Sequence, residues 1–385
     1  MENFIKSIFK TIFSIVFCFP SLFGAFLGTK DPDIDFKRAL QEQGIDFIGS
    51  VVYHLDSNLL GGIKTGVVNQ GLIDLGLLFH SEKILHYPGG ELFVNFEAHV
   101  GKNPSFTLTG DLLIFDGMSA PDFVQASEFW YKQKIQGFSC KIGRVSANLE
   151  LGFTENAQLF INNAYEALPF LAGYPIYPSA VPGAIFRYDW GKELGLKLGL
   201  FNGQESLFAY TRIYPFGIWR DFFKNLLVMA EVDTHFNHRG RLAAGFSYNN
   251  TEIFLATGAS QKIKYTGYFI GEYNFFDKYC CFVQGGLGNT TVLLFPHYLG
   301  LGVQVKQLLP IELENQLALG LASGFFTTKA PEEFGIKGSE ISLEATYVLN
   351  WGSCTIQPDF QYIIRPGGAG LPNALAFVLN IKVAL

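Results

Sequence analysis

Apolar residues alternate with polar or small residues in many short stretches of this chain, up to its last residue. The final stretch places one set of apolar side chains on a single face: Phe377, Leu379, Ile381, Val383 and Leu385. Asn380 and Lys382 fall on the opposite face. A period of two residues is that of a β-strand whose two faces have different surroundings. We therefore predict a last strand whose apolar face meets either a second sheet or lipid.

The same alternation recurs from about Ile45 onward. In each stretch one face is apolar, and the other mixes carboxylates, amides, glycine and alanine. The clearest examples are residues 91–100, 194–200, 228–233, 242–248, 311–322 and 340–349. Turn residues such as Asn202-Gly203 and Lys337-Gly338 separate the stretches, and no helical period of useful length interrupts them. At about 20 residues per strand and connection, the chain has room for roughly 16 strands, the size of a pore-forming barrel.

Composition favours lipid over a second sheet. The 385 residues include 39 Phe, 17 Tyr and 42 Gly, only 16% are charged, and the mean hydropathy is +0.21. This is too aromatic and too rich in glycine for an ordinary soluble α/β enzyme. A soluble sandwich would also carry more Lys, Thr and Ser on its outward face. We predict an all-β fold, a single transmembrane antiparallel β-barrel over residues 45–385.

The N-terminal residues predict export. Lys6 and Lys10 precede an apolar run from Thr11 to Leu27 that contains Pro20. Residues 1–28 are therefore predicted to be a signal peptide, with a retained anchor helix as the alternative. Residues 29–44 are predicted to form either a leader or a short helix. Beyond the N-terminus, no run of about 18 apolar residues lacks polar interruption, which argues against spanning helices.

Nothing in the sequence indicates catalysis, a cofactor or a metal. Motifs of serine hydrolases, zinc proteases and phosphate-binding loops are missing. His235 and His238 lie near Asp233 and Arg239, but in a polar stretch that indicates a solvated connection. The net charge of −6 comes without a basic stripe, so we predict no nucleic-acid partner.

The cysteines beyond the N-terminal region are few and scattered: Cys140, Cys280, Cys281 and Cys354. They lack the C-x-x-C spacing of zinc sites, and they are too few for a disulfide scaffold. Free thiols are the prediction, although export leaves disulfides open. Cys280 and Cys281 are adjacent and would point to opposite faces of a strand.

A series of short segments occurs in the order and spacing of one known family. The segments are Asn58-Leu59-Leu60-Gly61-Gly62, Gly101-Lys102-Asn103-Pro104-Ser105, Phe129-Trp130-Tyr131-Lys132-Gln133, Lys141-Ile142-Gly143-Arg144-Val145, Phe160-Ile161-Asn162-Asn163, Gln357-Pro358-Asp359-Phe360-Gln361-Tyr362 and Pro366-Gly367-Gly368. In these segments the chain resembles the carbohydrate-selective porin family, the porin B type of Gram-negative bacteria. The resemblance implies a single-chain outer-membrane barrel that passes monosaccharides and other small solutes down their gradients.

A sugar channel needs hydrogen-bond partners for hydroxyl groups and an aromatic face for the sugar ring. The matched segments give these candidates for pore-lining or solute-binding residues: Glu128, Trp130 (or Tyr131), Arg144, Glu344, Asp359, Gln361 and Arg365. Parity places Glu344, Asp359 and Gln361 on the polar face. Arg144 falls on the lipid side unless its strand ends or bulges there. The alternative role for all of them is cross-strand pairing that holds the barrel together.

The last two strands are predicted to close the barrel. Phe360 and Tyr362 would face lipid, residues 366–368 would make the turn, and the strand ending at Leu385 would pair with the first strand near Ile45. Aromatic residues that flank the strands, among them Tyr268 and Tyr298, would form the girdles at the two membrane interfaces.

We predict passive diffusion of small solutes, with a preference for carbohydrates, through a polar and acidic lumen in the cell outer membrane. The predicted partners are outer-membrane lipid and small sugars, and the choice between a monomer and a homo-oligomer such as a trimer stays open. The alternative is a structural or adhesive barrel with a largely plugged pore, whose long loops, especially residues 168–183, meet other surfaces.

Overall fold

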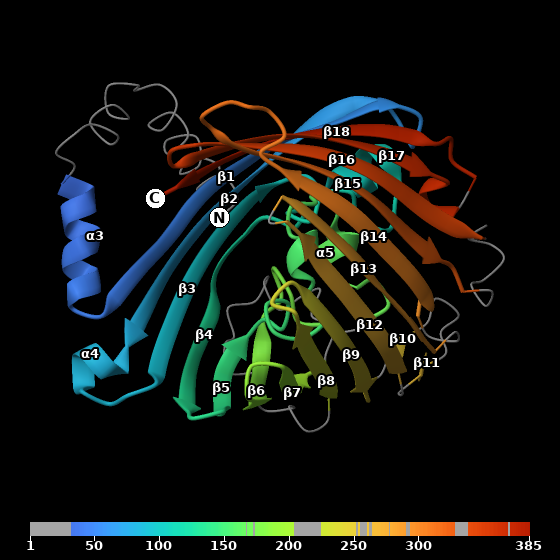
Figure 1. The fold of residues 1–385 in the computed structure, drawn as a ribbon. Coiled ribbons are helices and arrows are strands. Elements are labelled where there is room, and N and C mark those ends of the chain that lie inside the picture. Colours follow the sequence, from blue (N-terminus) through green and yellow to red (C-terminus); the bar gives the residue numbers. More distant parts are fainter. Residues whose placement is uncertain are drawn as a thin grey trace.

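The described residues form one closed barrel of 16 antiparallel strands (Figure 1). A computed structural model describes residues 32–166, 168–171, 174–203, 225–251, 253–254, 260–261, 264–276, 278–289, 293–327, 338–368 and 370–385. The first strand, β1 (Ile45–Leu60), pairs with the last, β18 (Ala374–Ala384), with Ser50 opposite Ala384. The predicted barrel and its closing pair of strands are confirmed.

The other barrel strands follow in chain order as β2 (Gly66–His80), β3 (Gly90–Gly101), β4 (Phe123–Ile135), β5 (Phe138–Val145), β6 (Val181–Trp190), β7 (Leu194–Asn202), β8 (Leu226–Phe236), β9 (Gly240–Asn249), β12 (Lys264–Phe275), β13 (Tyr279–Gly288), β14 (His297–Lys306), β15 (Glu314–Phe325), β16 (Ser339–Trp351) and β17 (Cys354–Ile364). β10 (Ile253–Phe254) and β11 (Ser260–Gln261) pair with each other outside the barrel sheet.

The helical elements are short: α3 (Pro32–Glu42), α4 (Ser81–Leu85), α5 (Asn163–Glu166), the π-helix η1 (Ser105–Thr109) and the 3-10 turns η2 (Glu155–Ala157) and η4 (Pro366–Gly368). Among the described helices, none has the length and apolar character needed to cross a membrane. The predicted signal peptide lies outside the described residues, whereas α3 falls within the stretch predicted as a leader or short helix.

Alternation along each strand decides which side chains face outward. In β7, Leu194, Leu196 and Leu198 are exposed, whereas Gly195 and Lys197 are buried. The last hairpin follows the same rule, because Phe360 and Tyr362 lie on the outer face with exposed fractions of 49% and 39%. Asp359 and Gln361 point inward and are fully buried. The outer face is thus apolar, as the sequence predicts.

The two ends of the barrel differ in their connections. β1 begins and β18 finishes at the end with short turns, which include residues 136–137, 191–193, 237–239 and 352–353. The turn between β8 and β9 is tight because Asn237 and His238 both adopt positive φ, the geometry that matches strand twist in a hairpin. Longer connections lie at the opposite end.

Two of the longer connections fold into the barrel (Figure 1). We call residues 102–122, between β3 and β4, the first inward segment. We call residues 146–180, between β5 and β6, the second inward segment, of which 167, 172 and 173 lie outside the described part. α5 belongs to the second segment and lies within the barrel.

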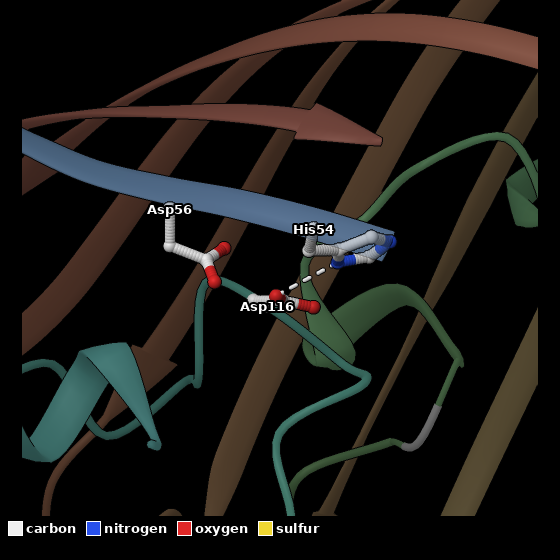
Figure 2. Close-up of side chains that lie close together, drawn as sticks. All are labelled: His54, Asp56 and Asp116. Carbon is white, nitrogen blue, oxygen red and sulfur yellow. Dashed lines mark hydrogen bonds and ion pairs between the residues drawn. The ribbon is translucent and has the colours of Figure 1, made fainter. Parts of the chain in front are cut away.

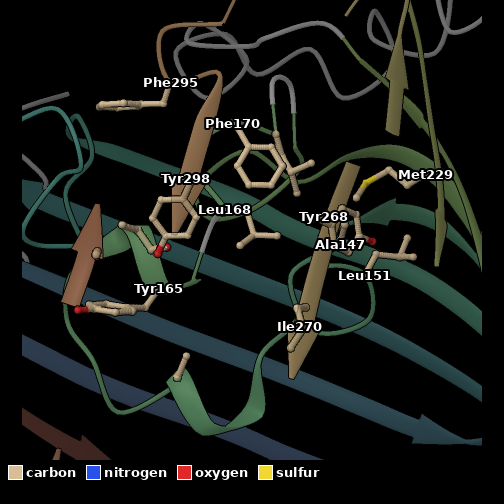
Figure 3. Packing of buried hydrophobic residues seen from close by; sticks show 14 of the residues in the cluster. Ala147, Leu151, Tyr165, Leu168, Phe170, Met229, Tyr268, Ile270, Phe295 and Tyr298 are labelled. Carbon is tan, nitrogen blue, oxygen red and sulfur yellow. Dashed lines mark hydrogen bonds between the residues drawn. The ribbon is translucent and has the colours of Figure 1, made fainter. Parts of the chain in front are cut away.

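The second inward segment forms an apolar core with the inner wall (Figure 3). Phe160 stacks on Tyr165 with 4.4 Å between ring centroids, and Phe282 of β13 meets the Phe160 ring edge-on at 5.7 Å. Phe170 lies against Tyr298 of β14 with 6.3 Å between ring centroids. Part of the inner face is therefore a packed core rather than a polar lining.

This core corrects two predictions. Leu168 and Phe170 are 2% and 0% exposed inside the barrel, so the described residues of 168–183 do not form an outward loop that meets other surfaces. Tyr268 and Tyr298 are 4% and 3% exposed and pack inward, so they are not girdle residues. The alternation gives the face of a residue, but it does not reveal that another segment covers the inner face.

The four described cysteines are free. Cys280 is buried on the inner face of β13, whereas Cys281 faces the other way and is half-buried, as expected for adjacent residues in a strand.

Candidate functional site

Buried charges fasten the second inward segment to β8 and β12. The Glu231 carboxylate accepts hydrogen bonds from Gly152 N at 2.7 Å and from Tyr268 Oη at 3.0 Å. It also pairs with Lys197 Nζ at 2.7 Å and with Arg241 at 3.1 Å. Because Glu231 is 1% exposed, both its charge and its hydrogen bonds are enclosed by protein.

The same segment continues along β12 to β17 through contacts with its backbone. Asn156 N donates to Glu272 at 2.7 Å, and Tyr298 Oη donates to the Ala164 carbonyl at 2.7 Å. Gln357 Nε2 donates to the carbonyl of Leu159 at 2.7 Å. Polar side chains of the wall therefore act here as anchors for an internal segment.

Glu344, Asp359 and Gln361 face the inside as predicted, but the inward segments cover them. The Glu344 carboxylate accepts hydrogen bonds from the backbone N–H groups of Ile161 at 2.6 Å and Asn162 at 3.3 Å. Glu344 is 3% exposed, and Asp359 and Gln361 are 0% exposed. Their direct contact with a solute stays a prediction, and these contacts match the alternative role of holding the structure together.

Gln361 also reaches the first inward segment, because its Nε2 donates to the carbonyl of Phe115 at 2.7 Å. Glu340 of β16 holds the same segment by accepting hydrogen bonds from Leu112 N at 3.0 Å and Leu113 N at 2.7 Å. Both inward segments are thus fixed to the wall formed by β16 and β17.

Arg144 lies near the end of β5, and its guanidinium turns away from the lipid side. Its register partner is Phe129, on the outer face, yet its guanidinium donates to the carbonyls of Ala126 at 2.7 Å and Ala180 at 3.0 Å. The register shifts between β3 and β4 near Ala126, and β5 ends one residue after Arg144. The end of β5 is therefore the predicted feature that lets Arg144 reach the inside, whereas the register shift belongs to the neighbouring β4.

Arg365 lies apart from the other candidates. It follows β17, is exposed, and donates to Ser339 Oγ at 2.6 Å. Its φ of +55° places it in the turn that leads to η4. It belongs to the barrel end with the longer connections.

Glu128 and Trp130 are half-buried on the inner wall, although Asn95 and His99 of the neighbouring β3 are buried. Glu128 Oε2 accepts a hydrogen bond from Trp130 Nε1 at 3.3 Å. The Trp130 ring lies 5.1 Å from the Phe93 ring and 4.3 Å from Lys141 Nζ. An aromatic face therefore lies beside a carboxylate and an ammonium group.

Two further carboxylates complete this wall, and they were not among the candidates. Asp74 of β2 is directly opposite Glu97 of β3, and Glu97 is opposite Gln125 of β4. Asp74 and Glu97 are half-buried and face inward. Parity alone puts Glu97 on the polar face. The alternation does not show that these two carboxylates stay more exposed than Glu231, Glu344 and Asp359.

Burial also raises the pKa values of acidic groups on the inward segments. Burial raises the pKa of the Asp111 carboxyl, although hydrogen bonds from Thr109 Oγ1 and Phe115 N partly offset the shift. Burial likewise raises the pKa of Glu166, with a partial offset from Asn148 Nδ2 at 2.9 Å.

Known proteins match the chain in sequence profile and in fold. The profile described as carbohydrate-selective porin, OprB family, matches residues 66–275 and 277–385. The search of the curated proteins gives no match. A high-pH structure of Pseudomonas putida OprB superposes with a TM-score of 0.81 at 17% identity, covering 91% of this chain and 96% of that one.

Two more solved structures share the fold at lower similarity. A low-pH structure of Pseudomonas putida OprB gives a TM-score of 0.60 at 14% identity, covering 93% of this chain and 98% of that chain. The outer-membrane channel DcaP of Acinetobacter baumannii gives a TM-score of 0.55 at 9% identity, covering 89% of this chain and 97% of that chain. These likenesses support the barrel fold.

Proposed function

The chain belongs to the carbohydrate-selective porin OprB family, and we propose that small carbohydrates cross its barrel along the inner wall from β2 to β5. As a porin it is an outer-membrane protein and a passive channel, and its family and fold are those of a channel rather than an enzyme. The short turns are assigned to the periplasmic side, as is usual for outer-membrane barrels.

The unequal covering of the inner wall supports this path. Glu231, Glu344 and Asp359 are buried under the inward segments, whereas Glu97 and Trp130 are half-buried. A carboxylate accepts hydrogen bonds from sugar hydroxyls, and an aromatic ring offers an apolar face to the sugar ring. Glu128 and Trp130 supply both groups side by side.

Liposome swelling tests the function. Vesicles that contain the folded protein should swell faster in isotonic hexose than in a trisaccharide, because the inward segments narrow the passage. The structural or adhesive alternative gains support from the apolar core inside the barrel, and it predicts no swelling. Absence of uptake with correctly folded protein would therefore reject the channel.

Trp130→Ala should weaken hexose binding inside the channel roughly two- to tenfold, the range expected for loss of one aromatic contact. The measurement is the sugar concentration that half-blocks ion current in a planar bilayer. Trp351→Ala is the matched control, because Trp351 is 69% exposed at the end of β16. Equal effects of the two substitutions would contradict a role for Trp130 in sugar contact.

The acidic wall should give the channel a preference for cations. Replacing Asp74 with Asn together with Glu97 with Gln removes two inward carboxylates and should move the reversal potential in a salt gradient towards zero. Glu82→Gln, on the exposed side of α4, is the control and should leave the potential unchanged. An unaltered potential in the double variant would exclude these carboxylates from the ion path.

A further inference from the structure

Three metal-ligating side chains meet where the first inward segment crosses β1. His54 and Asp56 are two residues apart and so share the inner face of that strand. Asp116 reaches them from the first inward segment, and Figure 2 shows the three side chains converging. One ligand atom from each lies within 4.8 Å of the other two, and all three residues are buried.

We propose that His54, Asp56 and Asp116 bind one divalent transition-metal ion, with Zn²⁺ as the expected occupant. The ion would fasten the first inward segment to the barrel wall, independently of the sugar path proposed above. One imidazole nitrogen and carboxylate oxygens form a donor set that suits Zn²⁺, which binds such ligands at about 2.0–2.2 Å. Two carboxylates also balance the charge of a divalent ion.

The geometry already orients these ligands. His54 Nδ1 lies 2.8 Å from Asp116 Oδ2, and the other Asp116 oxygen accepts a hydrogen bond from Met118 N at 2.9 Å. A hydrogen bond to the second oxygen of a carboxylate fixes its direction, as outer partners do in metal sites. Small side-chain shifts would bring all three ligands around one ion.

Unpartnered buried oxygens point independently to a missing ligand. Within the described part of the chain, Asp56 Oδ1 and Gln70 Oε1 have no hydrogen-bond partner. Asp56 is 0% exposed and Gln70 is 2% exposed, so bulk water cannot supply the missing hydrogen bonds. A buried oxygen without a partner is costly, and metal coordination would satisfy that of Asp56.

Gln70 offers a fourth ligand. Its Nε2 donates to Asp56 Oδ2 at 3.1 Å and to Asp116 Oδ2 at 2.7 Å. Rotation of the amide by half a turn exchanges nitrogen for oxygen and would direct Oε1 to the ion. His54, Asp56, Asp116 and Gln70 would then complete the four-coordinate shell that structural zinc prefers.

A second His–Asp pair, between β2 and β1, provides the comparison. His80 Nε2 lies 2.7 Å from Asp46 Oδ2, and their side chains are 32% and 35% exposed. Among the described residues, no third ligand joins this pair to make a metal cluster. Asp46→Asn is therefore a matched control for substitutions in the buried cluster.

Calorimetric titration of the chelator-treated, detergent-solubilised protein with ZnCl₂ tests the proposal. The wild type should bind one ion per chain. Asp56→Asn and Asp116→Asn should each weaken the affinity at least about tenfold, since loss of even an outer partner costs 10- to 100-fold. Asp46→Asn should bind as the wild type does. A wild type that binds no Zn²⁺, or cluster variants that bind it normally, would overturn the proposal.

A second measurement does not depend on the variants folding. Crystals of the wild type soaked in ZnCl₂ should give an anomalous peak between His54 Nδ1 and the carboxylates of Asp56 and Asp116. Peaks confined to surface histidines such as His80 would indicate adventitious binding only and would refute the site.

Discussion

Glu231→Ala should release the second inward segment from the wall while the barrel itself stays folded. The substitution removes the carboxylate closest to Lys197 and leaves Gly152 N without its acceptor. Arg241 loses the same partner but keeps Glu272 at 2.8 Å, and both cations stay within 3.9 Å of Asp233. Removing one partner of a buried ion pair typically costs about 3–5 kcal/mol. The barrel strands keep their backbone pairing, so the cost falls on the segment.

Single-channel conductance should therefore rise in Glu231→Ala, and amides of residues 147–166 should exchange with deuterium faster than in the wild type. Heat-modifiable migration on a denaturing gel should show that the barrel is intact. Glu314→Gln removes an exposed carboxylate at the start of β15 and is the control. Unchanged conductance together with unchanged exchange would show that Glu231 does not anchor the segment.

Gly320→Val should push the aromatic core away from β15 and open the same part of the barrel. A Cβ at Gly320 would lie 2.6 Å from both a Phe160 ring carbon and Tyr165 Oη, closer than packed atoms allow. Overpacking of this kind costs about 1–3 kcal/mol. Because Phe160 and Tyr165 belong to the second inward segment, the strain is relieved by displacing that segment.

Current noise and mean conductance should both increase in Gly320→Val, since a displaced segment samples more than one position. Gly267→Val is the matched control on β12, where an added Cβ would meet only the Gly245 carbonyl oxygen at 4.0 Å. The idea fails if the two valine variants conduct alike.

The alternation of residues along each strand predicts which face of the barrel wall most side chains occupy. It can do so because the direction of a side chain in a strand is a local property. Leu194 and Leu196 face outward, and Glu344 and Asp359 face inward, as the alternation predicts. The same reasoning indicates that Arg144 needs a bulge or a strand end, and the structure supplies the strand end.

The alternation does not predict which residues of the inner face are covered by the inward segments. Whether Glu344 meets water or the N–H groups of Ile161 and Asn162 depends on a connection far away in the sequence. Residues 146–180 contain short apolar stretches without a regular period, so the sequence pattern does not indicate where they lie. Their position inside the barrel depends on tertiary contacts. The alternation therefore places Glu344 and Asp359 among the predicted pore-lining residues, but it does not show that the inward segments cover them.

The apolar inner wall constrains how the barrel is assembled. Phe201, Met229, Ile270 and Phe282 point inward and are buried against the second inward segment. A barrel that closed first around water would expose these side chains to an aqueous interior, at a free-energy cost proportional to their area. The segment belongs to the same chain and contacts strands on both halves of the sheet, so it can pack against these side chains before the sheet closes. The pairing of β18 with β1 would then enclose an interior that is already packed.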